Sequence, residues 1–256
     1  MPDILYVEEG PVAVITLNRP ETLNAFNRAA RLGFIEAMRQ AQSAKGVRAV
    51  VLCGAGRGFS SGADLTERMP VEETLTLLDK EYAPGIQAIV SLPKPVIAAV
   101  HGFAAGIGVA YAPASDLVVM GEKAFMQVPF AKIGLVPDGG LCWQLAQRLG
   151  HRVAFEIAME GERLPAARCR ELGLVNRVVA EDGVVAEAKA WAARLAAQAP
   201  IAVAGTKNAL RRAGGATLED IMSLESRHQR ECVLSADFNE GVAAFFEKRP
   251  PRFSGS

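Results

Sequence analysis

The chain has 256 residues, half of them hydrophobic, which is enough for one large domain with a sizeable apolar core. Its 28 basic and 28 acidic residues balance, so no global field attracts polyanions or an anionic membrane, and nucleic acid is not an expected partner. No C-x-x-C pair occurs among the four cysteines, which argues against a zinc ribbon or a disulfide scaffold and indicates a cytoplasmic protein.

Strands and helices alternate in the first part of the chain. Residues 4–7 and 12–17 predict a hairpin. The fourfold spacing of Phe26, Ala30, Phe34 and Met38 then predicts a helix with one apolar face, with Arg31 off that face. Apolar runs at 47–53, 96–100 and 117–120 predict buried strands, and this alternation indicates an α/β fold.

One uncharged stretch, Pro95 to Ser115, is long enough to span a membrane. Prolines at its entrance and the His101-Gly102 interruption instead predict a strand, a turn and a short helix. We therefore expect no membrane-spanning segment.

Helices dominate the rest of the chain. The spacing predicts helices at 71–89, split by Pro84, and at 139–149, 152–159, 165–172 and 184–197, with a last strand at 174–179. After Pro200 the pattern is wholly helical, and Thr217 and Asp220 are spaced like a capping box. We place a soft boundary there, giving a core of residues 1–199 and a helical region of residues 200–256.

Two glycine-rich stretches each lead from a buried strand toward an expected helix start. They are Ser60–Asp64 and Gly102–Gly108. Backbone N–H groups at helix starts lack intrahelical partners, so the N–H groups of Ala63 and Ile107 could together hold a carbonyl oxygen that gains negative charge. The alternative is that these glycines only permit turns and close packing.

Several motifs, in this order along the chain, resemble the crotonase superfamily, the enoyl-CoA hydratase/isomerase family. They are Leu17–Pro20, Leu23–Ala25, Gly58–Leu65, Lys94–Gly102, Ser115–Leu117, Ile133–Gly140 and Phe246–Phe253. The resemblance implies a spiral of β-β-α units followed by a helical trimerisation region, and hence a homotrimer or hexamer. It also implies an acyl-CoA thioester as substrate, with no metal or redox cofactor.

The resemblance also implies roles for individual residues. Ala63 and Ile107 would supply the two N–H groups that hold the thioester oxygen, although Ile107 stands where a glycine is common. Residues near the coenzyme A nucleotide or pantetheine would be Arg19, Ala25, Ser61 and Leu65, with Lys248 or Arg252 reaching a phosphate, including one bound by a neighbouring subunit. Solvated surface charge is the alternative for the three basic residues.

Hydratases of this superfamily hold water with two glutamates, and the matching positions here are Ala110 and Phe130. Neither side chain can move a proton, so ordinary hydration is not implied. Asp138 matches the position where members such as the epoxyphenylacetyl-CoA isomerases keep a catalytic aspartate. Burial among Phe130, Val136 and Trp143 would raise its pKa toward that of a useful base. Its alternative role is to cap the helix that follows.

The leading hypothesis is therefore an enzyme that shifts a double bond of an acyl-CoA, or rearranges a related unsaturated or cyclic acyl-CoA, with Asp138 as the proton shuttle. A hydratase or hydrolase using a differently held water is the second hypothesis. The third is a non-catalytic acyl-CoA-binding protein, or an RNA-binding one that uses basic residues of the first helix: Arg28, Arg31, Arg39 and Lys45.

Overall fold

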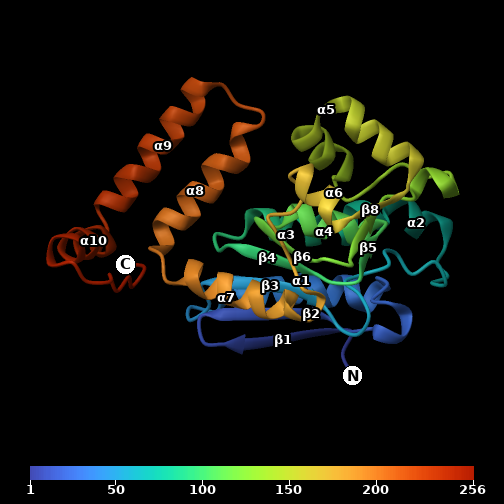
Figure 1. Cartoon of the computed structure of the whole chain (residues 1–256), viewed down its shortest axis with the longest axis horizontal. Coiled ribbons are helices and arrows are strands. Elements are labelled where there is room, and N and C mark those ends of the chain that lie inside the picture. The colour runs from blue at the N-terminus through green and yellow to red at the C-terminus, as the bar shows by residue number, and fades with distance from the viewer.

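The computed structural model describes residues 1–256 and is built on a six-stranded sheet (Figure 1). Its strand order is β1-β2-β3-β4-β6-β9, formed by Ile4–Glu9, Val12–Leu17, Ala49–Gly54, Val96–Val100, Leu117–Gly121 and Arg177–Val179. Strands β1 and β2 form the expected antiparallel hairpin, and the other pairs are parallel. This confirms the α/β class.

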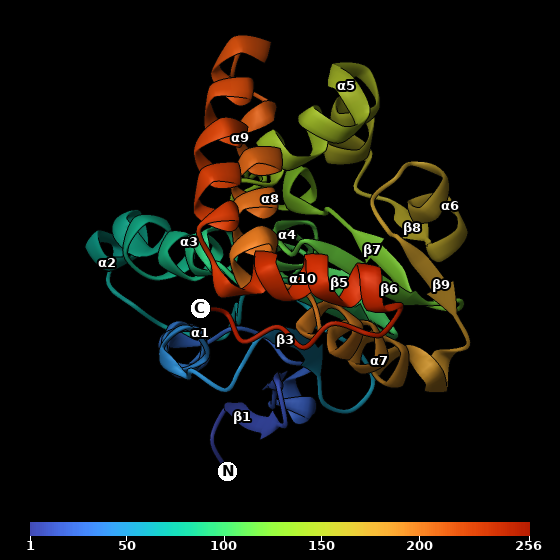
Figure 2. The ribbon, with the colours of Figure 1, turned by 90° about the vertical axis from the view of Figure 1, so that its left-hand side faces the viewer.

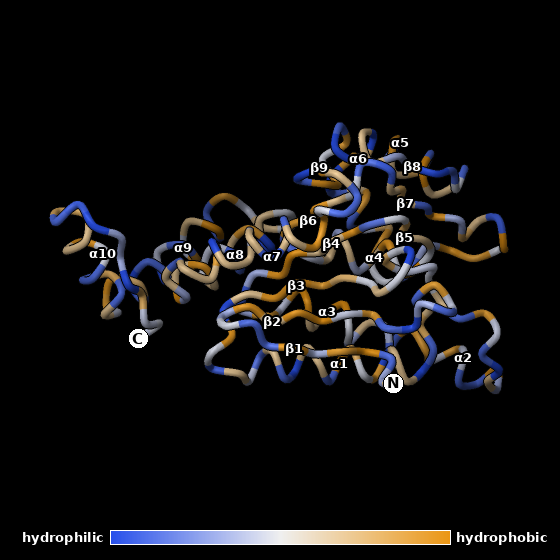
Figure 3. The backbone as a smooth tube through the Cα atoms, turned by 60° about the horizontal axis from the view of Figure 1, so that its bottom comes forward, coloured by the Kyte–Doolittle hydropathy of each residue, from blue (hydrophilic) through white to orange (hydrophobic).

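Helices cover both faces of the sheet, which is why β3 and β4 are buried at every residue and read as continuous apolar runs. One apolar core includes side chains from α1 (Arg28–Ser43), α3 (Ala83–Ser91) and α4 (Ile107–Ala114). A second core on the opposite face includes α7 (Val184–Ala196). Figure 3 shows the apolar runs of the strands in the middle of the molecule.

A second sheet has three short strands, β5 (Phe103–Ala105), β7 (Phe125–Gln127) and β8 (Arg163–Pro165). The chain passes from β4 through Gly102 into β5 and then into α4, so that one unit supplies a strand to each sheet and then a helix. Strands β5, β7 and β8 were not predicted because three residues are too few to show a strand period.

The expected break at Pro84 takes the form of a π-helix, η2 (Leu78–Tyr82), between α2 (Val71–Leu77) and α3. Helix α5 (Leu141–Glu160) is divided at Gly150, where the backbone is not helical, as the predicted gap between 149 and 152 required. The remaining elements are α6 (Ala166–Glu171) and the 3₁₀ turns η1 (Pro20–Thr22), η3 (Phe130–Ile133) and η4 (Glu181–Gly183).

The C-terminal helices are α8 (Pro200–Ala213), α9 (Leu218–Val233) and α10 (Ala236–Glu247). Figures 1 and 2 show α8 and α9 as an antiparallel pair that stands away from the sheet, with α10 at its foot. Thr217 and Asp220 form the predicted capping box. The division into residues 1–199 and 200–256 stays a prediction.

None of the helices combines the length and the apolar character needed to cross a membrane. The uncharged stretch from Pro95 to Ser115 instead forms β4, β5 and α4. The predicted strand and short helix are present as β4 and α4, and the unpredicted strand β5 lies between them. All four cysteines are free thiols.

Candidate active site

The loop that carries Ala63 is held by a bridge to Phe26. The Phe26 N–H donates to the Gly62 oxygen at 2.8 Å, and the Asp64 N–H donates to the Phe26 oxygen at 3.1 Å. Ala63 lies between these two hydrogen bonds, and in a parallel bridge such a residue directs its N–H away from the partner segment. The Ala63 N–H accordingly donates no hydrogen bond within the chain. The prediction of a helix start after Ala63 is wrong, since α2 begins only at Val71. The Ala63 N–H lacks an acceptor because of the bridge to Phe26, and not because it lies at a helix start.

Two buried polar side chains fix the same loop. Asn24 donates to the carbonyl oxygens of Ala55 and Gly58, both at 2.8 Å, and the Ser60 hydroxyl donates to the Asn24 oxygen at 2.8 Å. Asn24 has a φ of 56°, in the left-handed region that asparagine tolerates better than most residues. Asn24 and Ser60 were not among the predicted site residues, although Asn24 lies in the Leu23–Ala25 motif.

Ile107 lies beside this loop at the start of α4. Because it is the first residue of the helix, its N–H has no intrahelical acceptor. A Cβ atom on Gly62 would lie 2.9 Å from the Ala105 oxygen, so only glycine allows the two loops to approach this closely. The structure thus brings together the two segments that carry Ala63 and Ile107.

The Pro137–Gly140 segment packs against the first turn of α4. A Cβ atom on Gly139 would lie 2.6 Å from Cδ1 of Ile107 and 2.8 Å from Cβ of Ala110. Ile107 and Ala110 are both buried, and the Gln144 amide donates to the oxygens of Ala110 and Gly139. Asp138 is therefore adjacent in sequence to a glycine that contacts Ile107 and Ala110.

The Asp138 carboxyl does not cap α5. Gly140 is the N-cap residue of that helix, no side chain caps it, and Asp138 contributes only its backbone oxygen, to Leu141. Oδ1 of Asp138 is buried without a hydrogen-bond partner. The helix-capping alternative is therefore wrong, because the carboxyl makes no hydrogen bond to the helix.

Burial raises the pKa of Asp138 to about 6. Of the three residues expected around the carboxyl, Phe130 is buried, whereas Val136 and Trp143 are 75% and 54% exposed. Burial raises the pKa values of the Tyr82 and Tyr111 hydroxyls. Both side chains also lie close enough to Asp138 for its negative charge to raise these pKa values further.

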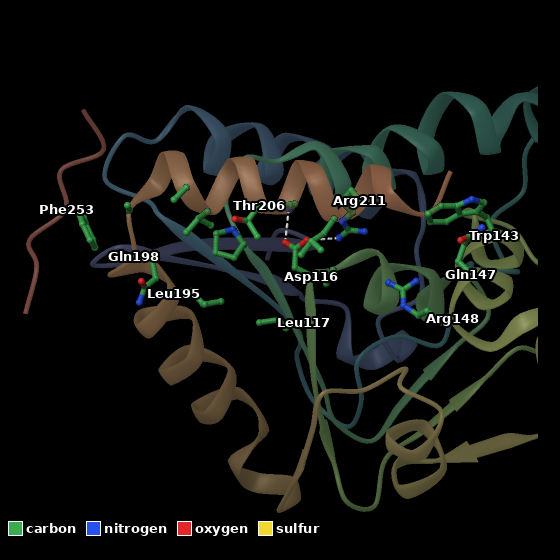
Figure 4. Close-up of a pocket in the computed structure, with 18 residues that line it drawn as sticks. Asp116, Leu117, Trp143, Gln147, Arg148, Leu195, Gln198, Thr206, Arg211 and Phe253 are labelled. Atoms are coloured by element: carbon green, nitrogen blue, oxygen red, sulfur yellow. Dashed lines mark hydrogen bonds and ion pairs between the residues drawn. The ribbon is translucent and has the colours of Figure 1, made fainter. Parts of the chain in front are cut away.

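A cavity of about 920 Å³ lies elsewhere, between α8 and the core (Figure 4). None of the predicted catalytic or substrate-binding residues lines it. Asp116 is paired there with Lys207 at 2.8 Å and Arg211 at 2.7 Å, with Trp143 and Arg148 at one end of the cavity and Phe253 at the other.

Residues 8–256 match the family model described as enoyl-CoA hydratase/isomerase. The chain belongs to this family. It is 37% identical over 255 residues to the 1,2-epoxyphenylacetyl-CoA isomerase of Escherichia coli, covering 98% of this chain and 97% of that one. It is 41% identical over 250 residues to a probable enoyl-CoA hydratase of Rhodobacter capsulatus, covering 97% and 96%.

The crystal structure of an enoyl-CoA hydratase from a Polaromonas species superposes with a TM-score of 0.93 at 36% identity, covering 98% of this chain and 99% of that one. The crotonase fold is thereby confirmed. This hydratase/isomerase family member is an enzyme acting on acyl-CoA, and its relatives carry both isomerase and hydratase names.

On the side predicted for coenzyme A, Arg19 is not the solvated charge of the alternative interpretation. Its side chain is 14% exposed, pairs with Asp64 at 2.9 Å and donates to the Ala25 oxygen at 2.6 Å. Ser61 directs its N–H and hydroxyl to the oxygens of Leu23 and Thr22. The structure gathers Arg19, Ala25 and Ser61 around one loop of the enzyme, and their contact with coenzyme A stays a prediction.

The remaining predicted residues are more scattered. Leu65 is 72% exposed beyond the Ala63 loop, and Phe130 is buried at the start of η3. Lys248 is exposed directly after α10, at the opposite end of the chain's fold from α2 (Figure 1), and Arg252 is exposed beyond it. Within one chain the structure does not bring Lys248 to Ala63 and Ile107.

The basic residues of α1 do not form an open face for RNA. Arg31 is 2% exposed and pairs with Glu67 and Glu81, so its expected position off the buried face is wrong. Arg28 pairs with Glu81 and Arg39 with Glu36. Acidic partners from α1 itself and from two distant segments thus pair with the three arginines, which the sequence had left almost unopposed. Lys45 lies just beyond the end of α1.

Proposed function

We propose that this family member shifts the double bond of an acyl-CoA thioester from the β,γ to the α,β position, or rearranges a related unsaturated or cyclic acyl-CoA. The observation that carries the proposal is the Asp138 carboxyl, which is partly buried, has a buried Oδ1 without a hydrogen-bond partner, and belongs to the residue before Gly139, which packs against the first turn of α4. At the positions matched to the hydratase glutamates stand Ala110 and Phe130, so one acid must serve in both proton transfers.

In this mechanism the N–H groups of Ala63 and Ile107 donate to the thioester oxygen. When the α proton leaves, electrons of the C–H bond move toward that oxygen, and donors in place stabilise the dienolate without reorganisation. Removing one such donor costs on the order of 10² to 10³ in turnover in other enzymes.

Asp138 takes the α proton and returns it to the γ carbon, which leaves the double bond in conjugation with the thioester. A pKa of about 6 suits this role, because the carboxylate is ionised at neutral pH yet is a stronger base than an ordinary aspartate. The name of the Escherichia coli relative supports the extension to a ring-containing acyl-CoA.

The test is a panel of acyl-CoA thioesters scored by absorbance and product mass. With β,γ-enoyl-CoA the proposal predicts that the absorbance of the conjugated thioester rises at unchanged mass. With α,β-enoyl-CoA it predicts no gain of water and no release of free coenzyme A. Rapid hydration or thioester hydrolysis would support the second hypothesis instead.

We also propose that residues 200–256 form a trimerisation region and that the enzyme is a homotrimer or a hexamer. Support comes from large apolar side chains left exposed on α8, α9 and α10 and at the end of α9: Leu210, Leu218, Met222, Leu234, Phe245 and Phe246. In such an assembly Lys248 would be available to a phosphate at a neighbouring subunit's site.

A further inference from the structure

Helix α1 contains an arginine that is almost completely removed from water. The Arg31 side chain is 1% exposed, although arginine is rarely buried without full pairing. Its Nη2 atom has no partner. A hydrophobic side chain would pack against the same neighbours without the cost of desolvating a charge, so stability alone is a poor explanation for this residue.

The other guanidinium nitrogens connect three segments of the chain. Nη1 donates to the Phe26 oxygen at 3.1 Å and to Glu67 at 2.8 Å, while Nε donates to Glu81 at 2.7 Å. Phe26 forms the bridge that orients Ala63, and Glu67 lies in the loop that follows Ala63. Glu81 belongs to the π-helix η2, a type of turn that occurs often at functional sites.

The Phe26 carbonyl oxygen accepts hydrogen bonds from three of these segments. It accepts from the Asp64 N–H, from Arg31 and, at 3.4 Å, from the hydroxyl of Tyr82, the residue after Glu81. Glu67 also accepts from the Arg28 N–H at 2.8 Å, so the loop after Ala63 is tied to the first turn of α1 twice. A displacement of this carbonyl would turn the Ala63 amide with it.

We propose that Arg31, with Glu67 and Glu81, is a positioning group that holds the Ala63 N–H in line with the substrate's thioester oxygen. This inference rests on the proposed function, in which that N–H stabilises the enolate. The planar guanidinium is required because it has several donors in a fixed arrangement, whereas a lysine ammonium on a flexible stem could not span Phe26, Glu67 and Glu81 at once.

The test removes the charges together, because Arg31→Met alone would leave two carboxylates without their partner. The variant is Arg31→Met/Glu67→Gln/Glu81→Gln, which keeps side-chain volume close to the original. The matched control is Arg39→Met, which breaks an exposed ion pair with Glu36 on the same helix. The readouts are kcat, KM, the melting temperature and the carbonyl stretching frequency of a bound acyl-CoA thioester.

We expect the triple variant to remain folded and to lose about 10-fold to 100-fold in kcat, with a smaller change in KM, because the donor acts mainly in the transition state. The thioester carbonyl frequency should move toward that of free ligand, while Arg39→Met should match the wild type. A triple variant with kcat within about threefold of wild type and an unchanged carbonyl frequency would overturn the inference.

If the wild-type enzyme binds acyl-CoA but shows no isomerase turnover, the proposed function fails, and the carbonyl frequency alone decides the role of Arg31. Should the triple variant not fold, Glu67→Gln is measured by the same readouts and judged by the same criteria. This single change removes the charge that Arg31 faces on the Ala63 loop and keeps an acceptor for the Arg28 N–H.

Discussion

Asp138 shows what the local sequence pattern can and cannot predict about a site residue. Asp138 precedes a helix, and from the sequence a helix cap and an acid at the mouth of a pocket look the same. The fold separates the two, because Gly140 occupies the N-cap position and the carboxyl is left partly buried and unpaired. The residue could be selected from the sequence, but its surroundings, including Tyr82 and Tyr111, come from segments that only the fold brings together.

The proposed base must be ionised to remove a proton, so activity should depend on pH in a defined direction. Burial raises the pKa of Asp138 to about 6, and the neutral carboxyl present below that pH is inactive. We expect kcat/KM for β,γ-enoyl-CoA to be level above about pH 7 and to fall about tenfold per pH unit well below the pKa. A flat profile between about pH 5 and pH 8 would exclude Asp138 as the base.

At the scale of elements, the apolar runs and the helix periods predicted the strands of the large sheet and most helices. They could not predict the strands β5, β7 and β8, or the bridges from Phe26 to Ala63 and from Ser60 to Ala104, because such pairings join distant segments. Arg31 was misplaced for the same reason: helical spacing identifies apolar faces, and its partners Glu67 and Glu81 lie outside α1.

The contact between Pro137–Gly140 and α4 gives a prediction at this scale. Gly139→Ala would place a methyl group 2.6 Å from Ile107 and would strain a backbone with a φ of +62°. Gly140 has a similar φ of +74°, but a Cβ there would meet only Nε2 of Gln144, at an unstrained 3.9 Å, so Gly140→Ala carries the backbone strain alone. We expect kcat to fall about tenfold or more further in Gly139→Ala than in Gly140→Ala, since Asp138 would be displaced from α4.

Equal kcat values for the two variants would show that the contact with α4 does not control the position of the carboxyl. Thermal unfolding of both proteins provides the necessary comparison. Both should melt below the wild type, and Gly139→Ala should melt lower because it combines overpacking with strain.

At the scale of the whole molecule, the C-terminal helices leave an unusual amount of apolar surface uncovered. The helices α8, α9 and α10 followed from the sequence, although residues 248–256 are not helical, contrary to the prediction. The direction in which α8 and α9 project could not be predicted, since it is set by packing against other surfaces. Monomeric proteins rarely expose large contiguous apolar patches, so this arrangement favours an assembly.

Light scattering tests the assembly directly. Three chains of 27.2 kDa predict a particle of about 82 kDa, and paired trimers predict about twice that mass. Phe245→Ser/Phe246→Ser, at two side chains that are 78% and 77% exposed, should shift the distribution toward smaller species. A wild-type monomer at micromolar concentration would contradict the proposed trimerisation region.

The central claim is that one carboxyl carries a proton between two carbons of an acyl-CoA whose thioester oxygen is held by two backbone amides. The most direct measurement is conversion of β,γ-enoyl-CoA to the conjugated thioester by the wild type, by Asp138→Asn and by a control, Asp182→Asn, each with its acyl-CoA affinity. Asp182 is an exposed residue of η4. We predict that Asp138→Asn loses about 10² to 10⁴ in kcat with affinity near wild type, while Asp182→Asn is unaffected. Turnover by Asp138→Asn within a few-fold of wild type would contradict the mechanism.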